Sequence, residues 1–120
     1  MHPSGASVDR MAVAELKQRL DRGEPLTVLD VREDHERAFC AIPLPVTAAD
    51  LHIPMAQVPA QLDVLRAAAS AAPLVVYCHH GMRSMTVAGW LARRGVEAVC
   101  NLEGGIDAWS ERVDPGIPRY

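Results

Sequence analysis

Short runs of strand-forming residues that alternate with helical stretches are the feature that most constrains how this chain can fold. The runs occupy residues 26–31, 74–77 and 97–102. Patterns typical of helices lie between and around them, over residues 13–20, 33–39, 59–70, 84–94 and 104–109. Because parallel strands joined by helices need crossover connections, this order favours a parallel sheet with helices on both faces. The sequence therefore predicts an α/β fold of three layers with a mostly parallel central sheet.

The length and composition of the chain fit one globular domain. Of its 120 residues, 49% are hydrophobic and 22% are charged, and a chain of this size can bury a core without disulfides or a metal. We find no internal repeat or linker, so we expect residues 1–120 to form a single domain. Residues 1–9 are expected to be a flexible arm, and residues 113–120 an irregular tail.

Charge and cysteine content narrow the range of partners and compartments. The 12 basic and 15 acidic residues are scattered, with a net charge of −3 and no basic block, so we expect no nucleic-acid partner. No apolar stretch approaches the length of a membrane span, and the first residues lack an apolar signal region. Three widely spaced cysteines, an odd number, indicate free thiols and a reducing compartment, which we expect to be the cytoplasm.

The loop from Cys78 to Ser84 joins a predicted strand to a predicted helix. A cysteine at such a junction lies among backbone N–H groups and the positive end of a helix dipole, which stabilise an anion. The dipole contributes only about 0.3–1 kcal/mol at exposed sites, so the loop amides must supply most of the stabilisation of a thiolate. Gly81 permits the positive φ that such a ring of amides needs. Arg83 offers a fork of donors for an oxyanion such as a sulfonate or phosphate. Since ligands bind beyond the carboxyl ends of parallel strands, Cys78 is the predicted nucleophile.

Plainer interpretations of these residues stay open. Cys78 could be a small core residue, because free cysteine is among the most buried residue types. Arg83 could be an ordinary exposed arginine. His79 and His80 beside a cysteine suggest a metal site, but adjacent ligands rarely converge on one ion and the other histidines lack a recognisable ligand spacing. We therefore expect neither a metal nor another cofactor.

Four segments stand in a specific order along most of the chain. They are Leu29-Asp30-Val31-Arg32-Glu33, an Ile-Pro element, Val75-Val76-Tyr77-Cys78 with Arg83-Ser84 after four further residues, and Asn101-Leu102-Glu103-Gly104-Gly105-Ile106-Asp107-Ala108-Trp109. In this order they resemble the single-domain rhodaneses, a family of sulfurtransferases. The form Cys-His-His-Gly-x-Arg-Ser and the ending Asp-Pro-x-x-Pro-Arg-Tyr are similar to those of small bacterial members.

The resemblance implies a rhodanese-like fold and a persulfide mechanism. The Cys78 thiolate would attack the outer sulfur of a donor such as thiosulfate, and sulfite would leave. The cysteine persulfide would then pass its sulfur to a thiophilic acceptor such as cyanide or a thiol. The substrate-binding wall of the pocket would be formed by His79, His80, Gly81, Met82 and Arg83. The implied partners are a small-molecule sulfur donor and acceptor, with a sulfur-relay protein as a further candidate.

The length of the loop distinguishes a sulfurtransferase from a phosphatase of similar fold. By the same resemblance, phosphatases of similar fold use Cys-x5-Arg, whose larger ring holds a phosphate, whereas Cys78 and Arg83 are separated by four residues. The smaller ring favours the transfer of one sulfur atom. Two alternatives remain: a sulfur-carrier or protein-binding rhodanese module without turnover, and, less favoured, a cysteine-dependent phosphatase or arsenate reductase.

The resemblance also assigns structural roles and exposes one departure. Asp30 and Arg32 would tie the end of the first strand to nearby loops, and Gly104-Gly105 would allow close packing. The His-Ile-Pro-Gly element usual in the family reads Ala41-Ile42-Pro43-Leu44, and a second Ile-Pro lies at His52-Ile53-Pro54-Met55. Four prolines in the region from Cys40 to Pro59 forbid a long helix there, so we expect a loop region with at most one short strand. The departure leaves the local geometry of residues 40–54 open. Cys100 is expected in the core, and Cys40 is either a loop residue or a resolving thiol for Cys78.

Overall fold

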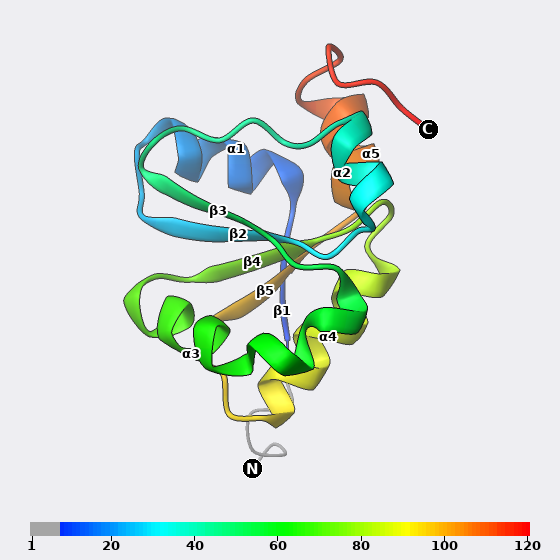
Figure 1. Cartoon of the computed structure of the whole chain (residues 1–120). Helices are drawn as coiled ribbons and strands as arrows, with labels where there is room; N and C mark the ends of the chain where they lie inside the picture. The colour runs from blue at the N-terminus through cyan, green and yellow to red at the C-terminus, as the bar shows by residue number, and fades with distance from the viewer. Residues whose placement is uncertain (1–7) are drawn as a thin grey trace.

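The computed structural model describes residues 8–120 and shows a five-stranded sheet packed between helices (Figure 1). The strands are β1 Asp9–Met11, β2 Leu26–Asp30, β3 Ala48–His52, β4 Leu74–Tyr77 and β5 Val99–Leu102. The helices are α1 Val13–Asp21, α2 Asp34–Phe39, α3 Leu62–Ala71, α4 Met82–Arg93 and α5 Gly105–Arg112, with 3₁₀ turns η1 Met55–Gln57 and η2 Pro59–Gln61. None of these helices is long and apolar enough to cross a membrane.

The sheet is parallel throughout, which confirms the predicted fold class. Its strand order is β1-β5-β4-β2-β3, so β4 is the central strand. Asp30, the last residue of β2, pairs with Tyr77 of β4 on one side and with His52 of β3 on the other. The carboxyl ends of three strands therefore meet at one edge of the sheet. Residues that follow β4 lie in the middle of that edge.

Helices cover both faces of the sheet: α1 and α5 on one face, α3 and α4 on the other (Figure 1). The side chains of β4 alternate between the two layers, as a strand requires. Val75 and Tyr77 join the hydrophobic cluster under α1 and α5. Leu74, Val76 and Cys78 join the cluster under α3 and α4. The period of two therefore directs Cys78 toward α4, the helix that follows it.

Local sequence signals explain where the helices beside this edge begin. Glu33 precedes α2 and forms a capping box with Glu36, in which each side chain accepts a hydrogen bond from the other residue's backbone N–H. Gly81, with φ of +107°, turns the chain into α4 two residues earlier than the predicted start at residue 84. Pro59 opens η2, which continues into α3.

The start of the chain differs from the sequence prediction. Residues 1–7 of the predicted arm lie outside the described residues, but Asp9 belongs to β1, which pairs with β5. The three residues of β1 carry little strand signal, because only Met11 is apolar and buried. Residues 113–120 contain no helix or strand, yet Tyr120 packs against the edge of the sheet where Cys78 lies.

The segment 40–54, expected to be a loop region with at most one short strand, supplies the edge strand β3. Ile42 is buried, and its N–H donates to the hydroxyl of Tyr77 at 3.4 Å. His52 places Nε2 at 2.8 Å from the carbonyl oxygen of Arg32. The segment thus packs against residues that follow β2 and lie at the end of β4, even though its sequence departs from the family pattern.

Candidate active site

Two backbone N–H groups point at the sulfur of Cys78. The side chain of Cys78 is 1% exposed and lies at the end of β4. Its Sγ accepts hydrogen bonds from the N–H of Gly81 at 3.1 Å and from the N–H of Ser84 at 3.3 Å. The left-handed conformation of Gly81 and the first turn of α4 aim these amides inward. The arrangement stabilises negative charge on sulfur by direct hydrogen bonds and by the helix end.

The hydroxyl of Ser84 adds a third polar contact to the sulfur. Ser84 Oγ lies 3.3 Å from Cys78 Sγ and donates to Oδ1 of Asn101. Asn101 in turn donates through Nδ2 to the carbonyl oxygen of Gly81 at 3.3 Å, which fixes its orientation. Sequence reasoning did not include Ser84 and Asn101 among the site residues. The signal that could have found Asn101 is a polar side chain within an otherwise apolar strand, because a buried polar group needs a partner.

The start of α5 holds the loop from behind. The N–H groups of Ile106 and Asp107 each donate at 3.0 Å, to the carbonyl oxygens of Cys78 and His79 respectively. A Cβ at Gly105, whose φ is +59°, would lie 2.4 Å from the Cys78 oxygen and 2.5 Å from the His79 oxygen. Only glycine fits there, as the close packing expected of Gly104-Gly105 requires. Because the carbonyl groups of Cys78 and His79 are bound to α5, the N–H groups of Gly81 and Ser84 are free to face the sulfur.

Arg83, expected to offer its donors to an oxyanion, is instead paired with Glu36 of α2. Nη1 donates to Oε1 at 2.7 Å and Nη2 to Oε2 at 2.9 Å, a bidentate geometry. The carboxylate also accepts from the hydroxyl of Tyr120 at 2.8 Å. Hydrogen bonds from Arg83 hold the pKa of Glu36 well below its usual range, so this carboxyl is ionised at neutral pH. Glu36 thus occupies both terminal nitrogens of the Arg83 guanidinium, so this fork of donors is closed in this structure.

A second, fully buried ion pair lies beneath this one. Arg32 donates through Nε and Nη2 to the two carboxylate oxygens of Asp30, at 2.9 and 2.8 Å, and neither side chain is exposed. Its Nη1 also donates to the Tyr120 hydroxyl at 2.9 Å, and Nη2 to the Cys40 carbonyl oxygen. Burial raises the pKa of Tyr120 to about 12, so the hydroxyl keeps its proton and links the two ion pairs. Arg32 and Asp30 therefore tie strand to loop, as the resemblance implied.

The two histidines of the loop stack on one another and on Tyr120. The ring of His79 lies 3.8 Å from that of His80 and 3.8 Å from that of Tyr120, measured between centroids. Burial lowers the pKa of His79, and the proximity of His80 lowers it further, so His79 is neutral at pH 7. Met82 is 81% exposed and forms part of the rim of the loop.

One group of potential metal ligands occurs among residues 8–120, at His79, His80 and Asp107. Their ligand atoms lie within 4.8 Å of one another. Both oxygens of Asp107 accept hydrogen bonds from Arg119, at 2.9 and 3.1 Å, so a cation already neutralises this carboxylate. The two imidazoles stack on one another, with 29° between their planes. We assign these residues to packing around the loop.

The other cysteines are not brought to Cys78. Cys40 packs against the cluster under α1 and α5, whereas Cys78 belongs to the cluster on the other face. Cys40 Sγ instead lies 3.7 Å from the Pro118 carbonyl oxygen. This placement does not favour the resolving role considered for Cys40. Cys100 is half-buried in β5, and burial raises the pKa of its thiol.

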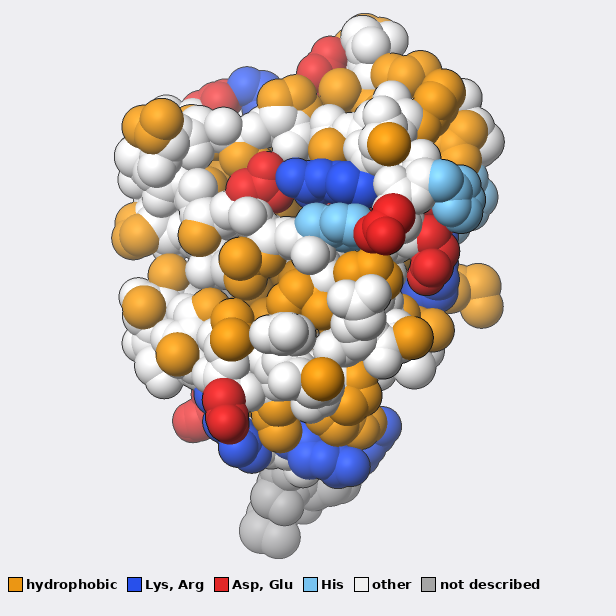
Figure 2. All heavy atoms as spheres, viewed as in Figure 1, with side chains coloured by type: hydrophobic (Ala, Val, Ile, Leu, Met, Phe, Trp, Pro, Cys, Tyr) orange, Lys and Arg blue, Asp and Glu red, His pale blue; other side chains and the backbone are white. Residues whose placement is uncertain are grey.

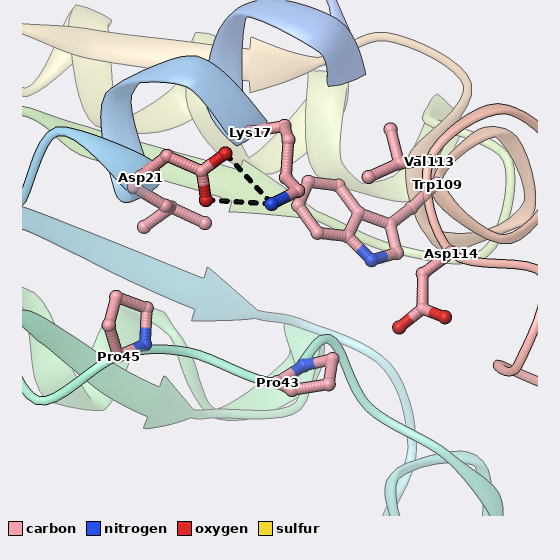
Figure 3. A pocket seen from close by; sticks show the side chains of 8 residues that line it. Lys17, Asp21, Pro43, Pro45, Trp109, Val113 and Asp114 are labelled. Carbon is pink, nitrogen blue, oxygen red and sulfur yellow. Dashed lines mark hydrogen bonds and ion pairs between the residues drawn. The ribbon is translucent and has the colours of Figure 1, made fainter.

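Three surface pockets differ in their relation to the cysteine loop. One of about 430 Å³ is lined by loop residues and by Arg10, Met85 and Glu103, and another of about 330 Å³ by His35, Glu36, Phe39 and Tyr120. A third, of about 560 Å³, lies between α1, α5 and the Pro43–Pro45 segment (Figure 3). Trp109 forms its wall beside the ion pair of Lys17 and Asp21. No residue of the cysteine loop lines this third pocket.

Comparisons with known proteins agree with the geometry. The rhodanese-like domain family matches residues 12–112. YtwF of Bacillus subtilis, named as a candidate sulfurtransferase, is 35% identical over 108 residues, which are 90% of this chain and 96% of that protein. The adenylyltransferase and sulfurtransferase MOCS3-1 of Zea mays is 32% identical over 115 residues, 92% of this chain but only 24% of that protein. The crystal structure of a rhodanese-like domain protein from Staphylococcus aureus has a TM-score of 0.74 at 29% identity, covering 94% of this chain and 99% of that one.

Proposed function

The chain belongs to the rhodanese family, and from that premise we propose that it is a sulfurtransferase that carries sulfane sulfur as a persulfide on Cys78. Family membership and the relatives named as sulfurtransferases support a sulfurtransferase or sulfur-carrier role. The observation that carries the proposal is the pair of N–H groups, from Gly81 and Ser84, aimed at the Cys78 sulfur.

The proposed reaction has two transfers at sulfur. The Cys78 thiolate attacks the outer sulfur of thiosulfate, a new S–S bond forms, and the S–S bond of the donor breaks to release sulfite. An acceptor such as cyanide or a thiolate then attacks the outer sulfur of the persulfide and regenerates the Cys78 thiolate. The two amides stabilise the anionic sulfur before and after transfer, which lowers the cost of each step. The Ser84 hydroxyl adds to this when its proton turns from Asn101 to the sulfur.

The loop residues have distinct proposed roles at the substrate. Gly81 acts through its backbone N–H, and His79 and His80 form a stacked wall on one side of the loop. Met82 contributes an exposed apolar rim. Arg83 acts by way of its ion pair with Glu36 rather than as a free anion-binding group.

The proposal extends to partners and compartment. The maize relative joins a sulfurtransferase to an adenylyltransferase in its name, which supports a sulfur-relay protein as donor or acceptor for this chain too. Three free cysteines support a reducing compartment such as the cytoplasm.

Intact-mass spectrometry tests the proposal directly. After incubation with thiosulfate, the protein should gain the mass of one sulfur atom, and cyanide should remove it with release of thiocyanate. Cys78→Ser should abolish both events, whereas the matched control Cys100→Ser should keep them, because Cys100 lies in β5 away from the loop. Sulfur gained equally by Cys78→Ser would contradict the mechanism.

The closed fork of Arg83 also favours a second candidate, a carrier that receives sulfur only from another protein. Such a carrier would be loaded by a cysteine desulfurase but would show no turnover with thiosulfate and cyanide. Steady-state thiocyanate production separates the two candidates. A Cys78-dependent hydrolysis of an aryl phosphate would instead point to a phosphatase.

A further inference from the structure

Glu36 sets the charge beside the cysteine loop, although it lies in a different helix. We propose that Glu36 is a specificity-determining residue, which neutralises Arg83 and thereby disfavours dianionic sulfur donors relative to donors with one negative charge or none, such as the persulfide of a thiol. This inference rests on the proposed persulfide chemistry of Cys78. It concerns which class of donor the site accepts.

The carboxylate of Glu36 is held too firmly to be displaced easily. It accepts four hydrogen bonds: two from Arg83, one from the Tyr120 hydroxyl and one from the Glu33 N–H at 3.0 Å. Its side chain is only 9% exposed, whereas that of Arg83 is 32% exposed. A donor oxyanion that is to bind the Arg83 fork must remove a carboxylate with four partners. Charge-assisted bonds of this kind are roughly twice as strong as neutral ones, so the exchange is unfavourable.

Neighbouring arginines on the Glu36 side are paired in the same way. Arg32 is bound by buried Asp30, and Arg37 of α2 contacts Asp30 at 3.4 Å and Asp50 at 2.9 Å. In the upper half of Figure 2, basic side chains likewise lie directly beside acidic ones rather than in a basic patch. These arginines therefore provide little attraction for a dianion approaching from this side.

The other side of the loop is mixed in charge and partly apolar. Arg10 lines the pocket there, but Glu103 lines it too, with Met82 and Met85 from the start of α4. The pocket beside Glu36 contains exposed Phe39, whose ring packs edge-on against Tyr120 with centroids 5.6 Å apart. Apolar walls disfavour a doubly charged donor because it must give up its hydration. They suit a donor that carries its transferable sulfur on an organic group, as a thiol persulfide does.

The charge balance of the transfer shows why this matters. With thiosulfate, a thiolate with one negative charge meets a dianion, and sulfite leaves with two. With a thiol persulfide, R–S–SH, the Cys78 thiolate attacks the outer sulfur, the S–S bond of the donor breaks, and R–S⁻ leaves and takes up a proton from water. The second reaction brings fewer negative charges together, so it depends less on a free cation at the loop.

The test compares two small donors that differ by one charge, thiosulfate (a dianion) and methanethiosulfonate (a monoanion). Glu36→Gln removes the carboxylate charge but keeps an oxygen at the N3 position for the Glu33 N–H, as a capping box allows. We expect the ratio of kcat/KM for thiosulfate to kcat/KM for methanethiosulfonate to rise about three- to tenfold in this variant at low salt. The gain should shrink as salt is added, because screening weakens the freed charge of Arg83.

Glu97→Gln is the matched control, since it makes the same change in net charge before β5, at the opposite end of the sheet. Its donor ratio should equal that of the wild type. An unchanged ratio in folded Glu36→Gln, with Cys78 still loaded by thiosulfate, overturns the inference and leaves the proposed function intact. Failure of every donor to place sulfur on Cys78 refutes the proposed function instead.

Tyr120→Phe provides a second measurement if Glu36→Gln does not fold. It removes one of the four hydrogen bonds to Glu36 and keeps the ring that stacks on His79. Because the carboxylate is then easier to displace, the donor ratio should shift toward thiosulfate by a smaller factor, about twofold. A ratio equal to the wild-type value in this variant also overturns the inference.

Discussion

Gly105→Ala tests whether α5 shapes the cysteine loop. Gly105 has φ of +59°, and an alanine Cβ there would lie 2.4 and 2.5 Å from the carbonyl oxygens of Cys78 and His79. These two oxygens accept the hydrogen bonds of Ile106 and Asp107. The substitution therefore strains the backbone of α5 and pushes both carbonyls away from their donors. The N–H groups of Gly81 and Ser84 should then no longer point correctly at Cys78 Sγ.

The expected cost follows from these contacts. A left-handed alanine costs about 1–2 kcal/mol, and weakening two backbone hydrogen bonds adds about 1 kcal/mol each. Gly105→Ala should thus lower the free energy of unfolding by about 3–4 kcal/mol. Gly95→Ala is the matched control, because Gly95 also has positive φ, +81°, but its Cβ would have no neighbour within 4 Å. Its free energy of unfolding should fall only by the cost of a left-handed alanine, about 1–2 kcal/mol.

Urea unfolding followed by circular dichroism measures the difference between the two variants. Intact-mass measurement of persulfide loading, performed where both are folded, measures the effect on the site. We expect Gly105→Ala to load more slowly than wild type and Gly95→Ala to load normally. Equal stability losses in the two variants, or normal loading of Gly105→Ala, would refute the view that α5 holds the loop rigidly.

Two further predictions concern the polar contacts of the site. Ser84→Ala keeps the amide but removes a hydroxyl 3.3 Å from Cys78 Sγ, whose proton can turn from Asn101 to the thiolate. Alkylation of Cys78 by iodoacetamide at pH 7 should therefore slow about three- to tenfold; an unchanged rate, judged against the exposed control Ser70→Ala, would show that the hydroxyl is not needed. The lowered pKa of Glu36 makes its contribution to stability complete above its unfolded value of about 4.3 and lost as the pH falls toward its folded value. The difference in unfolding free energy between wild type and Glu36→Gln should therefore be constant above about pH 5 and shrink in more acidic solution; a difference independent of pH down to the acid transition would contradict the ionised pairing.

Most of the fold could be predicted because its signals are local. Strand 74–77 and helix 13–20 rest on hydrophobic spacing within one element, and both lie where expected. The position of Cys78 followed from the end of a buried strand, and the need for glycine at Gly105 from its motif. β1 could not be predicted in this way, because its three residues gain their order from pairing with β5, a neighbour about ninety positions away.

The environment of Arg83 shows a second reason why part of the site could not be predicted from the sequence. The sequence indicated a guanidinium near the cysteine, but its partner Glu36 lies 47 positions earlier, and only packing of α2 against the sheet edge brings the two together. An acidic residue in the first turn of a helix is already explained by the helix dipole, so the local pattern at Glu36 carries no sign of this pairing. In the structure the same carboxylate caps α2, binds Arg83 and receives the Tyr120 hydroxyl. Because these contacts share one side chain, the position of α2 and the charge beside Cys78 are coupled, and a substitution that moves α2 should alter donor choice before it unfolds the protein.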